Sequence, residues 1–389
     1  MRAAWLATDF GTSDNLVRRS ISCRMSFFLT GPNISWEAAL MNPSRIALTF
    51  VVACGLAITT PLPGRAAVEY TVTDLGTLAG SPGFVQSVAN GLSDNGLVTG
   101  YSYVGNQMHA FVYDGTMHDL GPGTGNGIND SGEVVGTDGS GNIFLYNGTM
   151  QTIGVGTAGG INNSGEVTGS LQNSSAFVYD GTVHLLPQPP GGTFGFGIAI
   201  NSSGAVAGQA VVPSAVFQHE FAQIAYLYDG TLHEVGTNSG TQDNGPFMSI
   251  AFALNDHGDV VGTDSALPQG GFLYSGGVEH NIGGIVPMGI NNSDQVVGTN
   301  ANQALMYTSG GGIVNLNTLI NPASGWNLQW ATAINNVGQI VGYGTLNGDP
   351  LDSRAFLLTP VPEPSTLILG IVGVASLAFV ALRKKFRRA

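Results

Sequence analysis

Short apolar runs separated by Gly, Asn, Asp and Ser recur along most of the chain, and one ten-residue pattern organises them. Each copy has an Ile-Asn pair or its equivalent, a polar turn, and an apolar run that ends in Gly. The copies occupy residues 91–100, 127–136, 160–169, 199–208, 253–262, 289–298 and 333–342. Seven copies indicate one supersecondary unit that is used repeatedly, because such a unit cannot bury its apolar face alone.

A second recurring element is an apolar strand, a tight turn such as Asp-Gly, and a returning strand. Its first copy is residues 109–121, and variants occupy residues 143–154, 176–186, 225–236, 271–283 and 304–316. Asp-Gly and Asn-Gly between two such runs are the strongest local signal for a hairpin. Each repeat of roughly 40 residues therefore holds four short strands, which is the period of a propeller blade.

The two ends of the repeat region are complementary. Residues 69–76 form a strand that lacks the Ala-Phe strand expected before it, and residues 354–358 form an Ala-Phe strand that lacks its successor. Together they would complete one blade and close a ring without exposed sheet edges. We therefore expect an all-β fold, a seven-bladed β-propeller of four-stranded blades over residues 68–360. A β-solenoid, which also repeats and favours Asn and Gly turns, is the alternative.

The amino-terminal segment predicts export. Residues 1–40 show no repeat, and we interpret them as an extension upstream of the true start codon. From Met41, a basic region, an apolar run at residues 46–58 and the small residues that end at Ala66 and Ala67 are typical of a signal peptide over residues 41–67. We expect cleavage after Ala66 or Ala67. A lipoprotein signal that uses Cys54 is the alternative, although its apolar segment would be short.

The carboxy-terminal segment, residues 361–389, changes character. Pro362, Glu363 and Pro364 predict an extended stretch, and an apolar run and a cluster of Arg and Lys follow it. The run is just long enough for a helix to cross a thin bilayer, so we expect one transmembrane helix over residues 366–382. The basic end would stay cytoplasmic and leave the repeats outside.

Charge and cysteine exclude several functions for the repeat region. Between residues 68 and 360 there are 21 Asp and Glu but one basic residue, Arg354. Such a body repels phosphate backbones, so nucleic acid is not an expected partner. Cys23 and Cys54 both precede the repeats, which leaves the repeat region without a disulfide or a Cys-based zinc site. We expect no cofactor, with calcium as a minor alternative.

Several polar residues are candidate ligands, but the repeats offer a structural explanation for each. Three histidines occupy the same strand position and a fourth lies one place away: His118, His184, His233 and His280. They belong to different repeats, so they should not converge on one metal. Calcium could use oxygens from the turns: Asn129, Asp130, Glu133 and Asp138, or Asn255, Asp256 and Asp259. Turn chemistry already accounts for these residues, and none forms the ligand ladder of a calcium loop.

Catalysis has only weak candidates. Glu133 and Glu166 could form the carboxylate pair of a glycosidase, but they occupy equivalent repeat positions, which favours a surface role. A specific site is more plausible on the irregular insertions, because function concentrates on loops held by a rigid scaffold. These are residues 191–196, residues 213–223 with His219 and Glu220, and residues 236–249.

Two resemblances add to this interpretation. Residues 361–389, with Pro362, Glu363, Pro364, an apolar helix and an Arg-rich end, resemble the PEP-CTERM sorting signal. This implies processing near the triplet by a membrane-bound exosortase of a Gram-negative bacterium, and delivery to the cell surface or the exopolysaccharide matrix. Residues 70–358 resemble the HAF family of extracellular repeats, from His109-Ala110-Phe111, Asp-Leu-Gly and the Ile-Asn pattern. That family has no established catalytic residues, so the resemblance implies none.

The sequence therefore predicts an exported protein that is anchored transiently in the inner membrane and then sorted to the surface or matrix. We expect a non-enzymatic binding or scaffold protein of the envelope or biofilm. Its expected partners are an exosortase and either exopolysaccharide or another surface protein. An extracellular polysaccharide hydrolase or lyase on the same scaffold is the alternative.

Overall fold

The computed structural model describes residues 69–78, 85–172, 175–192, 194–213, 221–235, 248–267 and 270–361. These residues form strands and two short 3-10 helices, η1 (Leu316–Thr318) and η2 (Pro322–Ser324), so the all-β prediction is confirmed for them. No helix in this part of the chain is long and apolar enough to span a membrane. The predicted signal peptide, the Ala66 and Ala67 cleavage site, Pro362 to Pro364 and the transmembrane segment 366–382 lie outside the described residues.

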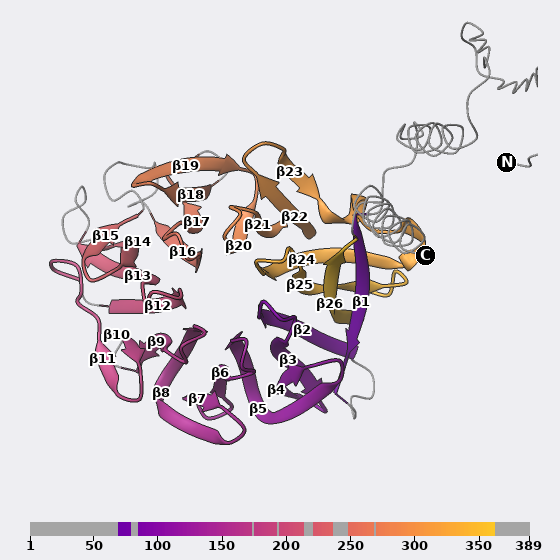
Figure 1. Cartoon of the computed structure of the whole chain (residues 1–389), viewed down its shortest axis with the longest axis horizontal. Coiled ribbons are helices and arrows are strands. Elements are labelled where there is room, and N and C mark those ends of the chain that lie inside the picture. The colour runs from indigo at the N-terminus through magenta and orange to yellow at the C-terminus, as the bar shows by residue number, and fades with distance from the viewer. Residues whose placement is uncertain are drawn as a thin grey trace, which may run out of the picture. The chain divides into compact units, whose positions relative to one another are not determined.

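The described strands form seven groups of four antiparallel neighbours, arranged around a common centre (Figure 1). The first three groups are continuous: β2 (Val85–Leu92), β3 (Val98–Val104), β4 (Gln107–Tyr113), β5 (Met117–Ile128), β6 (Val134–Asp138), β7 (Asn142–Tyr146), β8 (Met150–Ile161), β9 (Val167–Leu171), β10 (Ala176–Tyr179) and β11 (Val183–Leu185). In these groups, β5 and β8 are long strands that each belong to two groups. The first half of each strand pairs with the strand before it in sequence, and the second half pairs with the strand after it.

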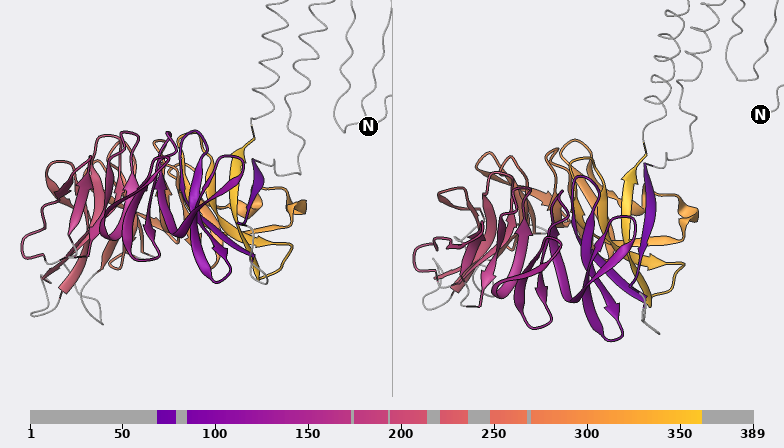
Figure 2. Two further views of the ribbon diagram at one scale, coloured as in Figure 1. Left: turned by 90° about the horizontal axis from the view of Figure 1, so that it is seen from below. Right: turned by 60° about the horizontal axis from the view of Figure 1, so that its bottom comes forward.

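Three separate four-stranded sheets follow. They are β12 (Phe194–Ile200), β13 (Val206–Pro213), β14 (Phe221–Tyr228) and β15 (Leu232–Glu234); β16 (Ser249–Leu254), β17 (Val260–Asp264), β18 (Gly271–Ser275) and β19 (Val278–Gly283); and β20 (Val286–Ile290), β21 (Val296–Asn300), β22 (Gln303–Thr308) and β23 (Gly312–Asn315). Side views show the strands spanning the thickness of a flat body (Figure 2).

The last group joins the two ends of the described chain. It contains β24 (Trp326–Ile334), β25 (Ile340–Leu346), β26 (Asp352–Pro360) and β1 (Tyr70–Gly76). β1 pairs antiparallel with β26 from Tyr70 opposite Pro360 to Gly76 opposite Ala355. The prediction that the end strands complete one sheet is therefore confirmed. A short parallel pairing of Val85 with Asp352 also links β26 to β2.

The closing Gly of the ten-residue pattern has a steric cause. A Cβ atom on Gly262 would lie 2.0 Å from the carbonyl oxygen of Ile250 and 2.7 Å from carbons of the Phe272 ring. Phe272 is fully buried, as is its equivalent Phe111 in the first group. The pattern thus needs Gly where the aromatic ring of the third strand packs across the second strand.

Adjacent groups share apolar clusters that hold them together. Ala205, Ala207 and Ala225 of one sheet pack with Val260 and Phe272 of the next. At the seam, Leu75 of β1 packs with Phe111, Val341 and Leu357, which come from opposite ends of the chain. The core is therefore a series of interfaces between neighbouring sheets, and β1 contributes to the last interface.

Candidate functional site

The seven Ile-Asn turns converge on one face of the body and are linked by hydrogen bonds. In six turns the side-chain Nδ2 of the buried Asn donates to a backbone oxygen of the next turn: Asn129 to Asn162 at 3.1 Å, Asn162 to Asn201 at 2.9 Å, Asn201 to Asn255 at 3.1 Å, Asn255 to Asn291 at 3.3 Å, Asn291 to Asn335 at 3.0 Å, and Asn335 to Ser93 at 2.9 Å. The bond from Asn335 to Ser93 connects the last copy to the first. The repeated Asn is therefore an inter-turn connector.

The following residue of each turn makes a second set of links. Asp94 N donates to Asp130 Oδ1 at 2.8 Å, and Asn336 N donates to Asp94 Oδ1 at 2.8 Å. Asn336 Nδ2 also donates to Asp94 Oδ2 at 2.9 Å. Asp94 thus accepts hydrogen bonds from Asn336, which is 242 positions away. The turns of the first and last copies are therefore joined through two residue pairs, Asn335 with Ser93 and Asn336 with Asp94.

A polar mouth of about 200 Å³ lies between these turns, lined by residues of all seven copies. Its floor is aliphatic, because the residue before each Asn or its equivalent points inward: Leu92, Ile128, Ile161, Ile200, Leu254, Ile290 and Ile334. Six of these residues, all but Leu254, also line a second cavity of about 220 Å³. The apolar half of the Ile-Asn pair therefore forms a constriction around the centre.

A third cavity, of about 450 Å³, shares lining residues with the second and is the largest of the three. It is lined by bulge residues, which are left unpaired where the innermost strand shifts register and so project toward the centre: Asn90, Asn126, Ile198, Phe252, Met288 and Thr332. We call this space the axial cavity. Its lining divides into amides and hydroxyls on some strands and apolar side chains on others.

The polar side chains of the axial cavity are only partly satisfied. Asn90 and Asn126 donate through Nδ2 to the carbonyl oxygens of Gly125 and Ala158, at 2.9 and 2.8 Å. Gln209 also lines the cavity, and among the described residues its buried Oε1 atom has no hydrogen-bond partner. Buried amide oxygens normally have a partner, so this cavity offers an unused acceptor.

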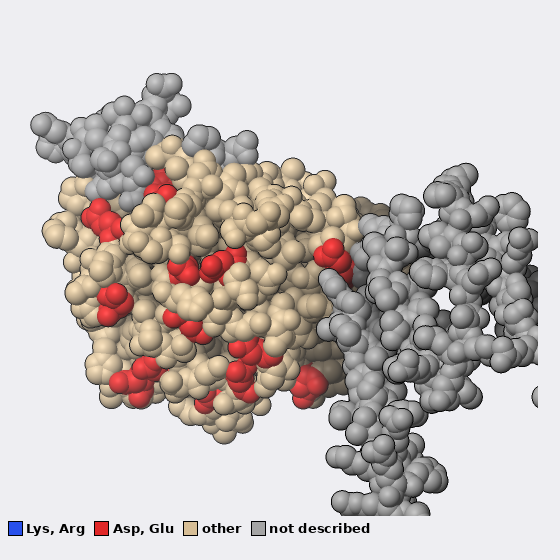
Figure 3. Space-filling model, turned by 45° about the horizontal axis from the view of Figure 1, so that its top comes forward, with Lys and Arg blue, Asp and Glu red and all other residues tan. Residues whose placement is uncertain are grey.

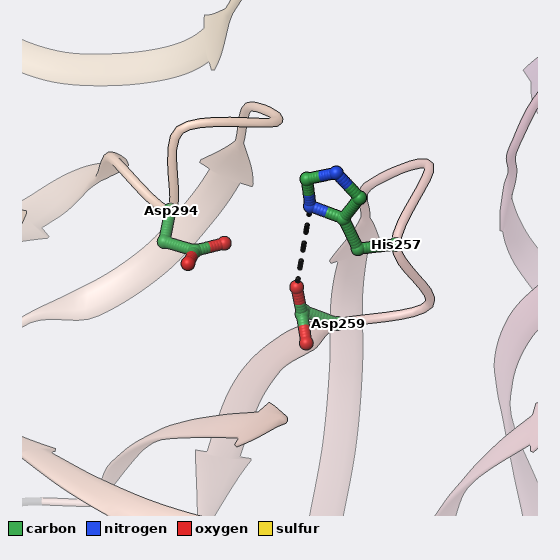
Figure 4. Close-up of side chains that lie close together, drawn as sticks. All are labelled: His257, Asp259 and Asp294. Carbon is green, nitrogen blue, oxygen red and sulfur yellow. Dashed lines mark ion pairs between the residues drawn. The ribbon is translucent and has the colours of Figure 1, made fainter. Parts of the chain in front are cut away.

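One junction between turns differs from the others. Here His257, Asp259 and Asp294 place one ligand atom each within 4.8 Å of one another (Figure 4). His257 and Asp259 come from the turn between β16 and β17, and Asp294 comes from the turn between β20 and β21. His257 Nδ1 lies 4.0 Å from Asp259 Oδ2, and Asn255 Nδ2 donates to both carboxylates, at 2.9 and 3.2 Å. We call these three residues the junction cluster.

Burial differs within the junction cluster. Asp259 is 6% exposed, Asp294 is half-buried, and the His257 side chain is 61% exposed. Burial and the neighbouring Asp259 carboxylate raise the pKa of Asp294 above its usual range. The face drawn in Figure 3 shows scattered acidic residues and no Lys or Arg among the described atoms.

The four histidines proposed from sequence lie apart from one another. His118, His184 and His233 lie exposed in three different strands, β5, β11 and β15, 2.9, 3.0 and 3.0 Å from Asp114, Asp180 and Asp229 of the preceding turns. His280 lies in β19 opposite Leu273. Hydrogen bonds from His118 and Thr116 lower the pKa of Asp114. The first three histidines thus pair locally, each with the Asp of the preceding turn.

The turn acids have local partners too. Glu133 Oε2 and Glu166 Oε2 each accept from the Asn of their own turn at 2.6 Å. Asp138 accepts from the backbone N–H groups of Ser140 and Asn142. Asp130 and Asp256 accept from the turns that precede theirs, through Asp94 N and Ser202 N. Residues 214–220, with His219 and Glu220, and residues 236–247 lie outside the described residues, whereas Phe196 of the first insertion lines the axial cavity.

Sequence reasoning named Asp259 but missed His257 and Asp294. A signal was available, because both break the repeat. Four copies have Ser where His257 stands, and six copies have Gly where Asp294 stands. Asp294 keeps the positive φ of that position, 55°. Departures from a strict repeat thus mark this junction.

Comparison with known proteins identifies one segment of the chain. Residues 360–388 match the family model described as the PEP-CTERM protein-sorting motif. Such a motif is a recognition signal for exosortase processing and implies an exported protein of a Gram-negative bacterium.

No curated protein matches the chain. The alpha-L-arabinanase of Penicillium chrysogenum complexed with arabinobiose is a similar solved structure, with a TM-score of 0.31 and 9% identity over 76% of this chain and 99% of the arabinanase chain. Dipeptidyl peptidase 4 of Porphyromonas gingivalis has a TM-score of 0.28 and 10% identity over 75% of this chain and 46% of its own.

Proposed function

We propose that residues 68–360 are a seven-bladed β-propeller of HAF-type repeats that acts as a non-enzymatic binding scaffold at the cell surface or in the exopolysaccharide matrix. The seven antiparallel groups and the links from Asn335 and Asn336 to the first turn support a closed ring. A β-solenoid would stack parallel strands of successive coils. The described pairings within each group are instead antiparallel.

The sorting motif supports delivery to the cell surface or the exopolysaccharide matrix. In this proposal an exosortase cuts near Pro362, Glu363 and Pro364, and the inner-membrane anchor is temporary. The released body then reaches the surface or matrix without its apolar tail. The acidic, Cys-free body suits an uncharged partner at that address better than an anionic one.

The lining of the axial cavity is the main observation that supports a binding function. Phe196, Ile198, Phe252 and Met288 give it an apolar side, while Asn90, Asn126 and Gln209 offer amides. This combination suits a neutral sugar unit, whose C–H face can pack on an aromatic ring while its hydroxyls bond to amides. A ligand hydroxyl would also satisfy Gln209 Oε1.

The same lining favours binding over hydrolysis. The described lining of the axial cavity contains no carboxylate, whereas glycoside hydrolysis usually needs two, about 5 to 9.5 Å apart. Glu133 and Glu166 are engaged by their own turns instead. The hydrolase alternative therefore has no carboxylate pair to support it in the described lining of this cavity.

The test is calorimetric titration of the full chain with neutral oligosaccharides from the producing organism's own exopolysaccharide. We expect Phe252→Ala to weaken binding at least about tenfold, because it removes the aromatic surface from the cavity. Phe221→Ala is the matched control, since Phe221 is 55% exposed and outside the cavity. Unchanged binding in Phe252→Ala would refute the cavity assignment, and release of new reducing ends would refute the non-enzymatic proposal.

A further inference from the structure

We propose that the junction cluster binds one divalent transition-metal ion of the zinc type, held by the His257 imidazole and the Asp259 and Asp294 carboxylates. The site is independent of the proposed sugar cavity, because it lies on the turns and not on the bulge residues. It would join the sheet β16–β19 to the sheet β20–β23.

The ligand types determine the class of ion. One imidazole nitrogen with two carboxylate oxygens is a mixed set that suits zinc, whereas calcium prefers six to eight oxygens. Three protein ligands leave a fourth position for water in a tetrahedral site. The exposed His257 ring keeps that position open to solvent.

The distances are compatible with a metal after a small adjustment. Zinc bonds of about 2.0 to 2.1 Å place tetrahedral ligand atoms about 3.4 Å apart. The longest separation in the cluster is at most 4.8 Å, and His257 Nδ1 to Asp259 Oδ2 is 4.0 Å. Because the imidazole is exposed, rotation of its side chain can supply most of the contraction.

The charges at this junction are otherwise uncompensated. The repeat region contains one Lys or Arg, Arg354, and it already pairs with Asp74 at 2.8 Å and with Asp352. No Lys or Arg in residues 68–360 remains to neutralise Asp259 and Asp294, which leaves only the exposed His257 imidazole beside them. Two adjacent carboxylates, one of them 6% exposed, repel each other unless a cation or a shared proton lies between them.

The repeat explains why Asp294 can reach Asp259. At two equivalent junctions a Cβ atom on Gly165 or Gly204 would lie 3.3 Å from the Oε2 atom of the preceding Glu133 or Glu166. A side chain at this position therefore points at the acid of the preceding turn. Asp294 in place of this Gly therefore brings a second carboxylate next to that of Asp259. The hydrogen bond from Asn255 to the next turn is 3.3 Å, longer than the 2.9 to 3.1 Å of the corresponding bonds at the other junctions.

The repeat also supplies variants that should fold. Asp294→Gly and His257→Ser each restore the residue that most copies carry, so neither introduces a foreign side chain. His184→Ser is the matched control, because it removes an imidazole that is as exposed as His257, lies in another sheet and pairs with Asp180 and Thr182 of its own hairpin.

The experiment is titration of the full chain with Zn²⁺ alone, followed by calorimetry and by metal analysis after dialysis. We expect one Zn²⁺ per chain in the parent and in His184→Ser. Asp294→Gly should weaken binding more than roughly 100-fold, since loss of an outer-shell partner alone costs 10 to 100-fold. Saturating Zn²⁺ should raise the Tm of the parent by roughly 3 °C or more but not that of Asp294→Gly.

Two outcomes would overturn the proposal. One is the absence of stoichiometric Zn²⁺ binding, or binding that Asp294→Gly leaves unchanged. The other comes from a parallel titration with Ca²⁺: Ca²⁺ binding tighter than Zn²⁺ binding and insensitive to His257→Ser would show that the imidazole is not a ligand. Neither result depends on sugar binding, so this proposal and the proposed function can fail separately.

Discussion

The link from Asn335 to Ser93 is the most direct test of ring closure, and Asn335→Ala removes it. Asn335 is 4% exposed. Its Nδ2 donates to Ser93 O at 2.9 Å and to Gln339 Oε1 at 2.8 Å, while its Oδ1 accepts from Gln339 N at 2.8 Å. One substitution therefore removes three hydrogen bonds, one of which joins residues 242 positions apart.

The expected loss follows from those three bonds. A buried hydrogen bond contributes about 1 kcal/mol net, so their removal should lower the free energy of unfolding by about 3 kcal/mol. Ser93 O keeps one donor, Gly96 N at 3.1 Å, which argues against a much larger loss. Chemical denaturation with linear extrapolation measures this difference.

Asn162→Ala is the control, because it changes the same turn position between two copies that are neighbours in sequence. Asn162 Nδ2 donates to Asn201 O at 2.9 Å and to Glu166 Oε2 at 2.6 Å, and its Oδ1 accepts from Ser164 N and Glu166 N, so its side chain makes four hydrogen bonds, one more than that of Asn335. If the ring is closed, both variants should lose similar stability. A loss of about 3 kcal/mol in Asn162→Ala but under about 1 kcal/mol in Asn335→Ala would refute closure through this bond.

Three further predictions address packing, pH and processing. Gly262→Ala should destabilise the fold by about 3 kcal/mol or more in denaturation, because its Cβ would meet Ile250 O, whereas Gly310→Ala, with open space around it, should change stability by less than about 0.5 kcal/mol. Burial, with a smaller effect of Asp264, raises the pKa of Glu279 from 4.5 to about 7, so its contribution to stability is complete below pH 4.5 and is lost as the pH rises through 7. After allowance for its partial exposure this amounts to about 1 to 2 kcal/mol, and Glu279→Gln should remove that slope from Tm measurements. Mass spectrometry of the exported protein should find a start at Ala67 or Val68 and no residues 367–389; an intact Arg-rich end would show a permanent anchor.

The strands and hairpins could be predicted because their formation depends mostly on residues that are close together in sequence. Alternating apolar positions, Asp-Gly turns and the complementary ends anticipated the pairing of Tyr70–Gly76 with Asp352–Pro360. The repeated Gly was visible in the pattern, although its contact with the aromatic ring of the third strand was not.

The axial cavity and the junction cluster were not predicted, because each depends on how separate turns and strands meet. A bulge leaves Phe252 unpaired between Ala251 and Ala253, and only the register shift turns it toward the centre. Asp259 and Asp294 are 35 positions apart, and their contact arises from the stacking of consecutive turns. Asp259 and Asp294 occupy ordinary turn positions of the repeat. Their significance therefore appears only where the residue type departs from that of the other copies.

The seam has a mechanical consequence under the proposed export route, in which a signal peptide precedes the repeats and the sorting motif follows them. Val361 N donates to Glu69 O at 2.8 Å, so the chain enters and leaves the described body at neighbouring points. A pull between a tethered tail and the amino terminus would load the β1–β26 pair alone and leave the other six groups unstretched. If export begins at the proposed signal peptide, the seam would also set the order of assembly, because β26 would be among the last segments to be translocated. The body would therefore hang from the membrane by a single point, and its fold could be completed only when the tail that holds it has nearly emerged.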